Sequence, residues 1–252
     1  MKRLFGALYL LLCLGFIVGC SDNGGSGGGG GGNSGGGISG AEELNLSGQV
    51  WAEEWIYIQG GDIPTSITYS PFTRNVEISY SLGGEGSITN GQLNFNVGTP
   101  TLDTWHTASS YFYDWRNKYR YFEISNPSAK AAGLWFSTPF DGFSREFNTV
   151  SRRGSTYTGI FQRVEFVYVD QDITIVGYGR TNFWEESNPT LKVTEITKDI
   201  NITLKKGWNS IFSNINWTAT VSGSGNNLTQ TMEWTETVSI ANPNNLRWVL
   251  ID

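Results

Sequence analysis

The sequence predicts an all-β fold, an antiparallel β-sandwich of roughly a dozen strands, which follows an apolar amino-terminal segment and a glycine-rich linker. From Ala41 onward, short stretches in which apolar and polar residues alternate are separated by Gly, Asn, Asp and Pro, which favour turns. A long run with the 3.6-residue period of a helix is not visible. Together these two observations favour strands joined by hairpins over helices.

The amino terminus has the pattern of a secretory signal peptide. Two cations, Lys2 and Arg3, precede an apolar run from Leu4 to Val18. A helix needs about 20 apolar residues to cross a bilayer, so this shorter run is better explained as a signal that is removed. We therefore assign residues 1–19 to a signal peptide.

The end of this segment, IVGC at residues 17–20, resembles the lipobox of bacterial lipoproteins. In that family a peptidase cuts before the cysteine, which carries a diacylglyceryl group and is then acylated, typically with palmitate. The resemblance implies that Cys20 anchors the mature protein in a membrane of the cell envelope, since two or more acyl chains hold a protein stably. Ser21 follows the cysteine, where the proteobacterial sorting rule places Asp for the inner membrane, and this favours the outer membrane. The alternative is that Cys20 merely ends an ordinary signal peptide.

Cysteine content and charge exclude several classes of function. The two cysteines are Cys13, inside the signal, and Cys20, so the mature domain has no thiol for a disulfide, a zinc site or a nucleophile. The formal net charge is −6, and loss of Lys2 and Arg3 makes the mature chain more acidic. An acidic surface argues against nucleic acid as a partner.

Residues 20–40, the lipidated cysteine and a run rich in glycine, predict a flexible tether. Residues 41–252 are then one β domain, long enough to bury a core of its own. A second boundary within residues 140–151 stays an alternative.

Within the domain the strands are expected in order. Alternating residues predict strands near 75–81 and 92–98, and Asn90-Gly91 between them suits a type I′ hairpin turn. The nearly continuous apolar run at 164–179 predicts two strands joined at 170–172 in a central position. Further strands are expected within 199–212, 228–241 and 246–251. The predicted core contains Val76, Ile78, Phe95, Val97, Phe166, Ile175, Ile202 and Trp248.

The stretch from Trp105 to Phe122 contains eight aromatic residues among eighteen, against 14% for the whole chain. One interpretation is a short helix that caps the sandwich, with Tyr111 and Trp115 in the core. The other is a binding surface, because aromatic rings stack on sugars and other planar ligands. Four residues, three of them in this stretch, are candidate ligand contacts: Trp105, Tyr113, Tyr119 and Trp184.

Charged residues are interleaved with these rings. Arg116, Lys118 and Arg120 form a local cationic cluster in an acidic protein. They can meet a carboxylate of a ligand, or pair with Asp114 and Glu123.

Catalytic and metal-binding patterns are few. His106 is the only histidine, and no G-x-S-x-G elbow, H-E-x-x-H motif, EF-hand loop or phosphate loop occurs, so neither a metal nor a cofactor is expected. Paired carboxylates could serve glycoside hydrolysis. However, the strand pattern places Glu53 and Glu54, and likewise Glu233 and Glu236, on opposite faces, while Glu185 and Glu186 fall in an expected loop.

These observations predict a lipid-anchored protein of the cell envelope whose β domain is a non-catalytic module that binds glycan or another surface partner. A carboxylate-dependent glycoside hydrolase and a purely structural envelope protein are the alternatives.

Overall fold

The structure of the chain is a computed structural model that describes residues 37–58, 63–80, 84–101, 105–137, 142–186, 190–223 and 228–251. Cys20 and the predicted signal peptide lie outside the described residues. No helix in this part of the chain is long and apolar enough to cross a membrane.

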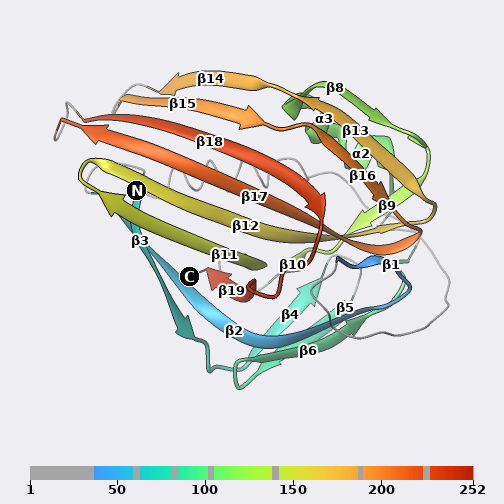
Figure 1. Cartoon of the computed structure of the whole chain (residues 1–252). Helices are drawn as coiled ribbons and strands as arrows, with labels where there is room; N and C mark the ends of the chain where they lie inside the picture. The colour runs from blue at the N-terminus through green and yellow to red at the C-terminus, as the bar shows by residue number, and fades with distance from the viewer. Residues whose placement is uncertain are drawn as a thin grey trace.

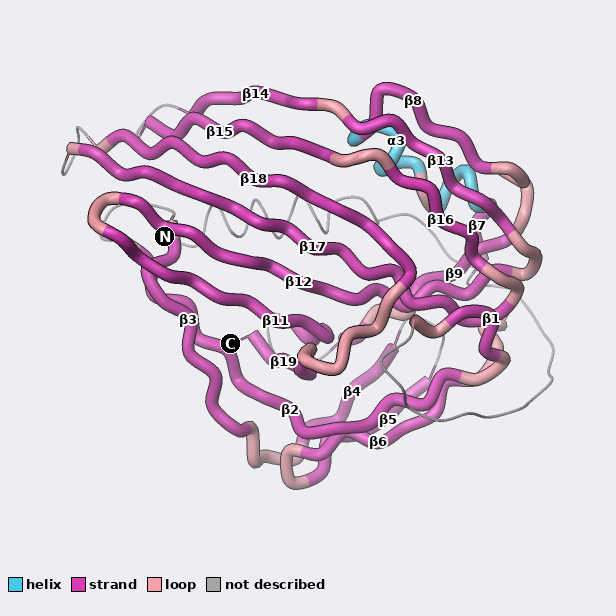
Figure 2. Tube along the Cα trace, viewed as in Figure 1, coloured by secondary structure: helices cyan, strands magenta, loops and turns pink. Residues whose placement is uncertain are grey.

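Strands dominate the structure, which confirms the predicted all-β class (Figure 1, Figure 2). The strands of the amino-terminal half are β1 (Ser39–Ala41), β2 (Leu44–Tyr57), β3 (Pro64–Pro71), β4 (Val76–Tyr80), β5 (Gly84–Thr89), β6 (Gln92–Val97), β7 (His106–Thr107), β8 (Tyr119–Ile124), β9 (Lys130–Gly133) and β10 (Phe136–Ser137). Those of the carboxyl-terminal half are β11 (Gly142–Arg153), β12 (Thr156–Val169), β13 (Ile173–Gly179), β14 (Thr181–Glu186), β15 (Thr190–Thr197), β16 (Ile200–Leu204), β17 (Gly207–Ser222), β18 (Thr229–Ile240) and β19 (Arg247–Ile251). Two short helices, α2 (Ala108–Tyr111) and α3 (Tyr113–Lys118), precede β8.

The strands form one continuous 16-stranded sheet and one 3-stranded sheet, which differs from the expected pair of sandwich sheets. The long path runs β10-β4-β5-β6-β2-β19-β11-β12-β17-β18-β15-β14, and the small sheet is β16-β13-β8. Most pairs are antiparallel, but β15–β18 and β19–β2 are parallel. In Figure 1, β4, β5 and β6 lie below β11 and β12, so the large sheet folds back on itself.

The fold-back depends on β2, which changes partners midway. Residues 44–49 pair with β6, and residues 50–53 pair with β19. Gly48 has φ 141 at the change, and a Cβ there would lie 3.3 Å from Trp248 Cδ1. Trp248 Nε1 also donates to Ser47 O at 3.1 Å. The tryptophan thus fills the inside of the bend, where a residue with a side chain would crowd it.

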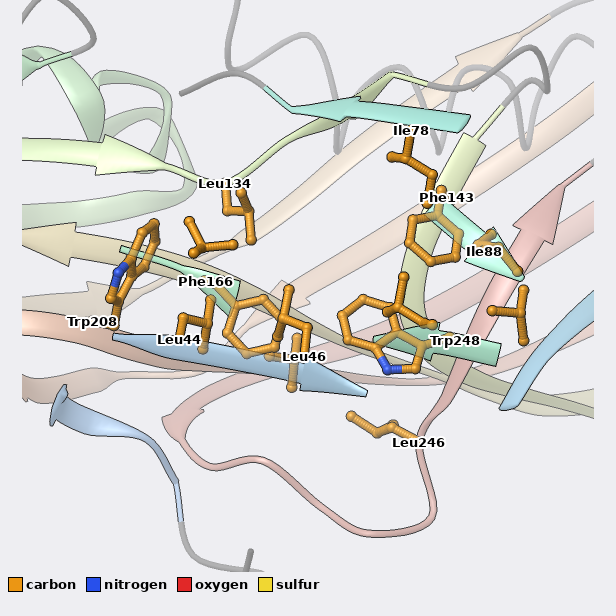
Figure 3. Close-up of a cluster of buried hydrophobic side chains, with 14 of the residues drawn as sticks. Leu44, Leu46, Ile78, Ile88, Leu134, Phe143, Phe166, Trp208, Leu246 and Trp248 are labelled. Carbon is orange, nitrogen blue, oxygen red and sulfur yellow. The ribbon is translucent and has the colours of Figure 1, made fainter. Parts of the chain in front are cut away.

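The core divides into three clusters, and β12 contributes to all of them. On one face, Phe166 and Tyr168 pack with β2, β4, β5 and β6, in the cluster shown in Figure 3. On the opposite face, Val167 and Val169 pack against the small sheet and the helices. The third cluster contains Phe161 and lies over β15, β17 and β18. Burial on both faces explains the continuous apolar run of β12 and confirms its central position.

The predicted core is largely confirmed. Ile78, Val97, Phe166, Ile175, Ile202 and Trp248 are buried, and Val76 is partly buried. The side chain of Phe95 lies outside the described residues.

The folded part begins slightly earlier than the expected boundary at residue 41. Strand β1 pairs with β17, and Ile38 packs on the first core cluster. Ser210 N also donates to Ile38 O at 2.9 Å. Residues 38–40, which were assigned to the tether, are therefore held by the sheet.

Candidate functional site

The four aromatic residues predicted as ligand contacts lie in different places. Trp105 is half-buried against Tyr168 of the first core cluster, with ring centroids 5.5 Å apart. Trp184 is half-buried beside Trp234 in the third cluster. Tyr113, on α3, is 59% exposed. The structure does not bring them together on one surface.

Tyr119 was expected to be exposed, and this expectation is wrong because its side chain is buried. The reason is a glycine on the neighbouring strand. A Cβ on Gly177 of β13 would lie 2.8 Å from Tyr119 Cγ, so the absence of that Cβ makes room for the ring. Tyr119 then stacks on Phe122 at 5.7 Å.

Most of the aromatic stretch is core, as one of its two interpretations proposed. Tyr111, Phe112 and Trp115 are buried and meet edge to face at 4.8 and 5.1 Å. Thr107 caps α2 by accepting from Ser110 N at 3.2 Å. These helices cover one side of the second core cluster, beside the small sheet (Figure 1).

A second exposed tyrosine of this stretch, Tyr121, stacks on Tyr178. The two residues are cross-strand neighbours on β8 and β13, with ring centroids 5.3 Å apart and planes 28° apart. They are 45% and 53% exposed. The Tyr121 hydroxyl donates to a carboxylate oxygen of Glu123, and this hydrogen bond holds the pKa of Tyr121 above its ordinary value. Two large rings therefore stand side by side in solvent on a regular sheet.

Polar residues surround this pair on the outer side of the small sheet. Glu123 lies opposite Val176, which in turn lies opposite Asn201. Thr174 and Thr203 are also cross-strand neighbours, with hydroxyl oxygens 3.2 Å apart. We call this surface the tyrosine face; its members are Tyr121, Glu123, Thr174, Val176, Tyr178, Asn201 and Thr203.

A pocket lies at the end of the small sheet, where β8 and β13 meet irregularly. The register shifts between Tyr178 and Gly179, and Arg120 is the extra residue on β8. Such bulges redirect a side chain. Arg120 Nε donates to Gly179 O at 2.7 Å, at one wall of an open pocket of about 910 Å³. The pocket is lined by Arg120, Gly179, Arg180, Thr181, Asn182, Ile196, Thr197, Lys198 and Asp199, and we call it the cationic pocket.

The three glutamate pairs considered in the sequence analysis do not form a hydrolytic site. Glu53 is buried while Glu54 is exposed, and Glu236 is buried while Glu233 is exposed, as strand alternation predicted. Glu185 and Glu186 are both exposed, but they lie at the end of strand β14 and not in the expected loop.

A different pair, Glu53 and Glu146, is joined inside the protein and was missed by the sequence analysis. Asn148 Nδ2 donates to Glu53 Oε1 at 2.8 Å and to Glu146 Oε1 at 3.2 Å. Burial, and next the charge of Glu53, raise the pKa of Glu146 to about 8, while Arg163 opposes the shift. The Tyr69 hydroxyl completes the cluster by accepting from Asn148 N at 2.7 Å. Both carboxyls are buried, unlike the pair in an open cleft that a glycosidase needs.

Metal binding has no support in the described ranges, where no group of three or more His, Cys, Asp or Glu residues could hold an ion. His106 is half-buried in β7.

Comparisons with family models, with curated proteins and with solved structures find no match for this chain. The tyrosine face and the cationic pocket are therefore interpreted from their own chemistry. Sequence reasoning missed Tyr178, Arg180 and Lys198. The outward positions 174, 176 and 178 of β13 offered a signal for Tyr178, whereas the pocket depends on strand register.

Proposed function

We propose that this chain is a lipid-anchored protein of the bacterial cell envelope whose β domain binds glycan through the tyrosine face. The observation that carries the proposal is the exposed, stacked pair Tyr121–Tyr178. The flat apolar faces of pyranose rings stack on aromatic side chains, and their hydroxyl groups need hydrogen-bond partners nearby. Glu123, Asn201 and Thr203 supply such partners on the same face.

An alternative explanation is that the pair only stabilises the sheet. Cross-strand aromatic pairs contribute about 0.2–1 kcal/mol on their own. Exposure of about half of each ring leaves much of its apolar surface in water, where a ligand could cover it. A test has to measure stability and binding separately.

The anchor belongs to the same proposal. Lipidation of Cys20 would hold the protein at the envelope, with the outer membrane favoured by Ser21. The glycine-rich segment would then place the β domain among envelope or external polysaccharides. The formal net charge of −6 argues against nucleic acid as the partner, because like charges repel.

The experiment compares wild type with Tyr121→Ala/Tyr178→Ala on an oligosaccharide array, followed by calorimetric titration. Two rings at about 0.5–1.5 kcal/mol each predict a loss of affinity of about fivefold or more. Tyr113→Ala is the matched control, because Tyr113 is an equally exposed tyrosine on α3. The double variant should unfold within about 1 kcal/mol of wild type. Unchanged binding in the double variant would refute the role of the tyrosine face.

Assays of reducing-sugar release on the same oligosaccharides separate the remaining functions. Binding without release supports a non-catalytic module. Release would favour the hydrolase, and the absence of both would favour a structural protein.

A further inference from the structure

The cationic pocket continues the tyrosine face. Arg120 and Gly179 line the pocket and are the chain neighbours of Tyr121 and Tyr178. The bulge at this point ends the regular pairing of β8 with β13 and turns Arg120 toward Gly179 O. A chain of sugars stacked on the two tyrosines would therefore have this pocket next to it.

The charge of the pocket is opposite to that of the whole protein. Arg120, Arg180 and Lys198 line it together with a single carboxylate, Asp199. Asp199 Oδ1 accepts a hydrogen bond from Gly179 N at 2.8 Å, so this oxygen already has a backbone partner. Within the described part of the chain, none of the three cations forms an ion pair. Three positive charges are thus left facing one open space.

Two buried polar atoms in the pocket wall also have no hydrogen-bond partner among the described residues. Thr197 is only 3% exposed, and its Oγ1 has no hydrogen-bond partner among the described residues. Arg180 Nε is likewise buried and without a partner in the described ranges. Buried donors are rarely left unsatisfied in proteins, which points to a ligand or bound water at this position. Both atoms can donate to an acceptor oxygen.

We propose that the cationic pocket binds the acidic group of an anionic glycan, either the carboxylate of a uronic acid or a sulfate ester. This inference rests on the proposed function, because the tyrosine face would hold the neighbouring sugar. Arginine suits the site because its planar guanidinium can donate two parallel hydrogen bonds to such an oxyanion. Arg120 uses Nε for Gly179 O and keeps its terminal nitrogens for the ligand.

The experiment titrates three probes against the full chain: an oligogalacturonate, a sulfated oligosaccharide of the heparin type and a neutral cello-oligosaccharide. Wild type should bind at least one acidic probe more tightly than the neutral one, and added salt should reduce this preference. Whichever acidic probe binds better identifies the group as carboxylate or sulfate.

Arg120→Met/Lys198→Met is the decisive variant, because both side chains are exposed, and its thermal unfolding checks that loss of the Arg120 Nε bond to Gly179 O leaves the fold intact. It should weaken binding of the acidic probe by about tenfold or more, since hydrogen bonds to charged groups are among the stronger ones. Neutral-probe binding should not change. Arg152→Met/Arg153→Met, which removes two exposed arginines from the distant β11–β12 hairpin, is the matched control for net charge.

Thr197→Val provides a second variant that keeps the shape of the side chain and removes only the hydroxyl group. It should also weaken binding of the acidic probe and leave binding of the neutral probe unchanged. Equal affinity of wild type for acidic and neutral probes, or an Arg120→Met/Lys198→Met variant that binds the acidic probe like wild type, would overturn the assignment while the tyrosine face stands. If wild type binds none of the three probes and no oligosaccharide of the array, the proposed function itself fails.

Discussion

Lys118 Nζ lies 3.1 Å from both carboxylate oxygens of Glu236 and thereby fixes helix α3 to strand β18. Glu236 is nearly buried, whereas Lys118 keeps about a quarter of its side chain exposed. Burial lowers the pKa of Lys118, but Glu236, with Glu165 and Glu195, raises it further, so its pKa lies above the ordinary value. The ion pair is therefore fully formed at neutral pH.

Removing one partner of this pair should be costly. Lys118→Met leaves the Glu236 carboxylate buried without its cation, and we expect the free energy of unfolding to fall by about 3 kcal/mol, the lower end of the range for buried pairs. Lys118→Met/Glu236→Gln should recover much of this loss, because no buried charge remains. Urea unfolding measures both. If the free energy of unfolding of Lys118→Met lies within about 0.5 kcal/mol of that of wild type, the usual range of surface substitutions, the ion pair contributes nothing to stability.

Stability should depend on pH through Glu146. Its pKa is about 8 in the folded protein, against the ordinary glutamate value of 4.5 in the unfolded chain. Between these values the folded state holds a proton that the unfolded state releases, so the free energy of unfolding falls as pH rises from about 4.5 to 8. The slope from this one group is at most about 1.4 kcal/mol per pH unit, and it vanishes above pH 8.

Glu146→Gln isolates this effect, because the amide stays neutral at every pH. The stability of wild type relative to this variant should decline across the window and level off above it, as measured by denaturant unfolding at about pH 4.5, 6, 8 and 9. A constant difference would mean that Glu146 is ionised throughout.

Within the aromatic stretch, Trp115 should behave as a core residue and Tyr113, two residues earlier, as a surface residue. Trp115→Ala removes a buried ring that packs edge to face on Phe112, and we expect a loss of about 3–5 kcal/mol. Tyr113→Ala, in the same helix, should change stability by no more than about 0.5 kcal/mol. Thermal and urea unfolding of the two variants provide the comparison, and similar losses would contradict the burial described for α3.

The anchor is tested by Cys20→Ala. The variant should either be released as soluble protein or accumulate as the uncleaved precursor, because it lacks the acceptor for the lipid. Membrane fractionation and electrophoretic mobility distinguish these outcomes from wild type. A variant that fractionates and migrates as wild type does would show that Cys20 is not lipidated.

Local patterns predicted the parts of the fold that depend on neighbouring residues. Alternation located the strands and separated Glu53 from Glu54, and the continuous apolar run of β12 identified a strand buried on both faces. Asn90 and Gly91 both have positive φ, as the hairpin signal requires.

Features that depend on strand register could not be predicted in this way. Glu146 and Asn148 alternate with Phe147 and resemble the solvent side of a strand, yet both are buried beside Glu53, which is far away in the sequence. The tyrosine face has the same origin, since only the pairing of β8 with β13 places Tyr121 beside Tyr178. The fold is all-β as predicted but is not clearly a two-sheet sandwich, for a related reason. No local sequence pattern indicates that β2 pairs first with β6 and then with β19, which joins the layers into one sheet.

Strand β19 sets the order in which the protein can be assembled during synthesis. It follows every other strand that the structure describes, yet it lies between β2 and β11 in the long sheet. The ladders that join β2 to β11 through β19 can therefore form only after residues 247–251 have left the ribosome. Contacts between residues so distant along the chain also form slowly. This part of the long sheet is therefore the last to close among the strands that the structure describes.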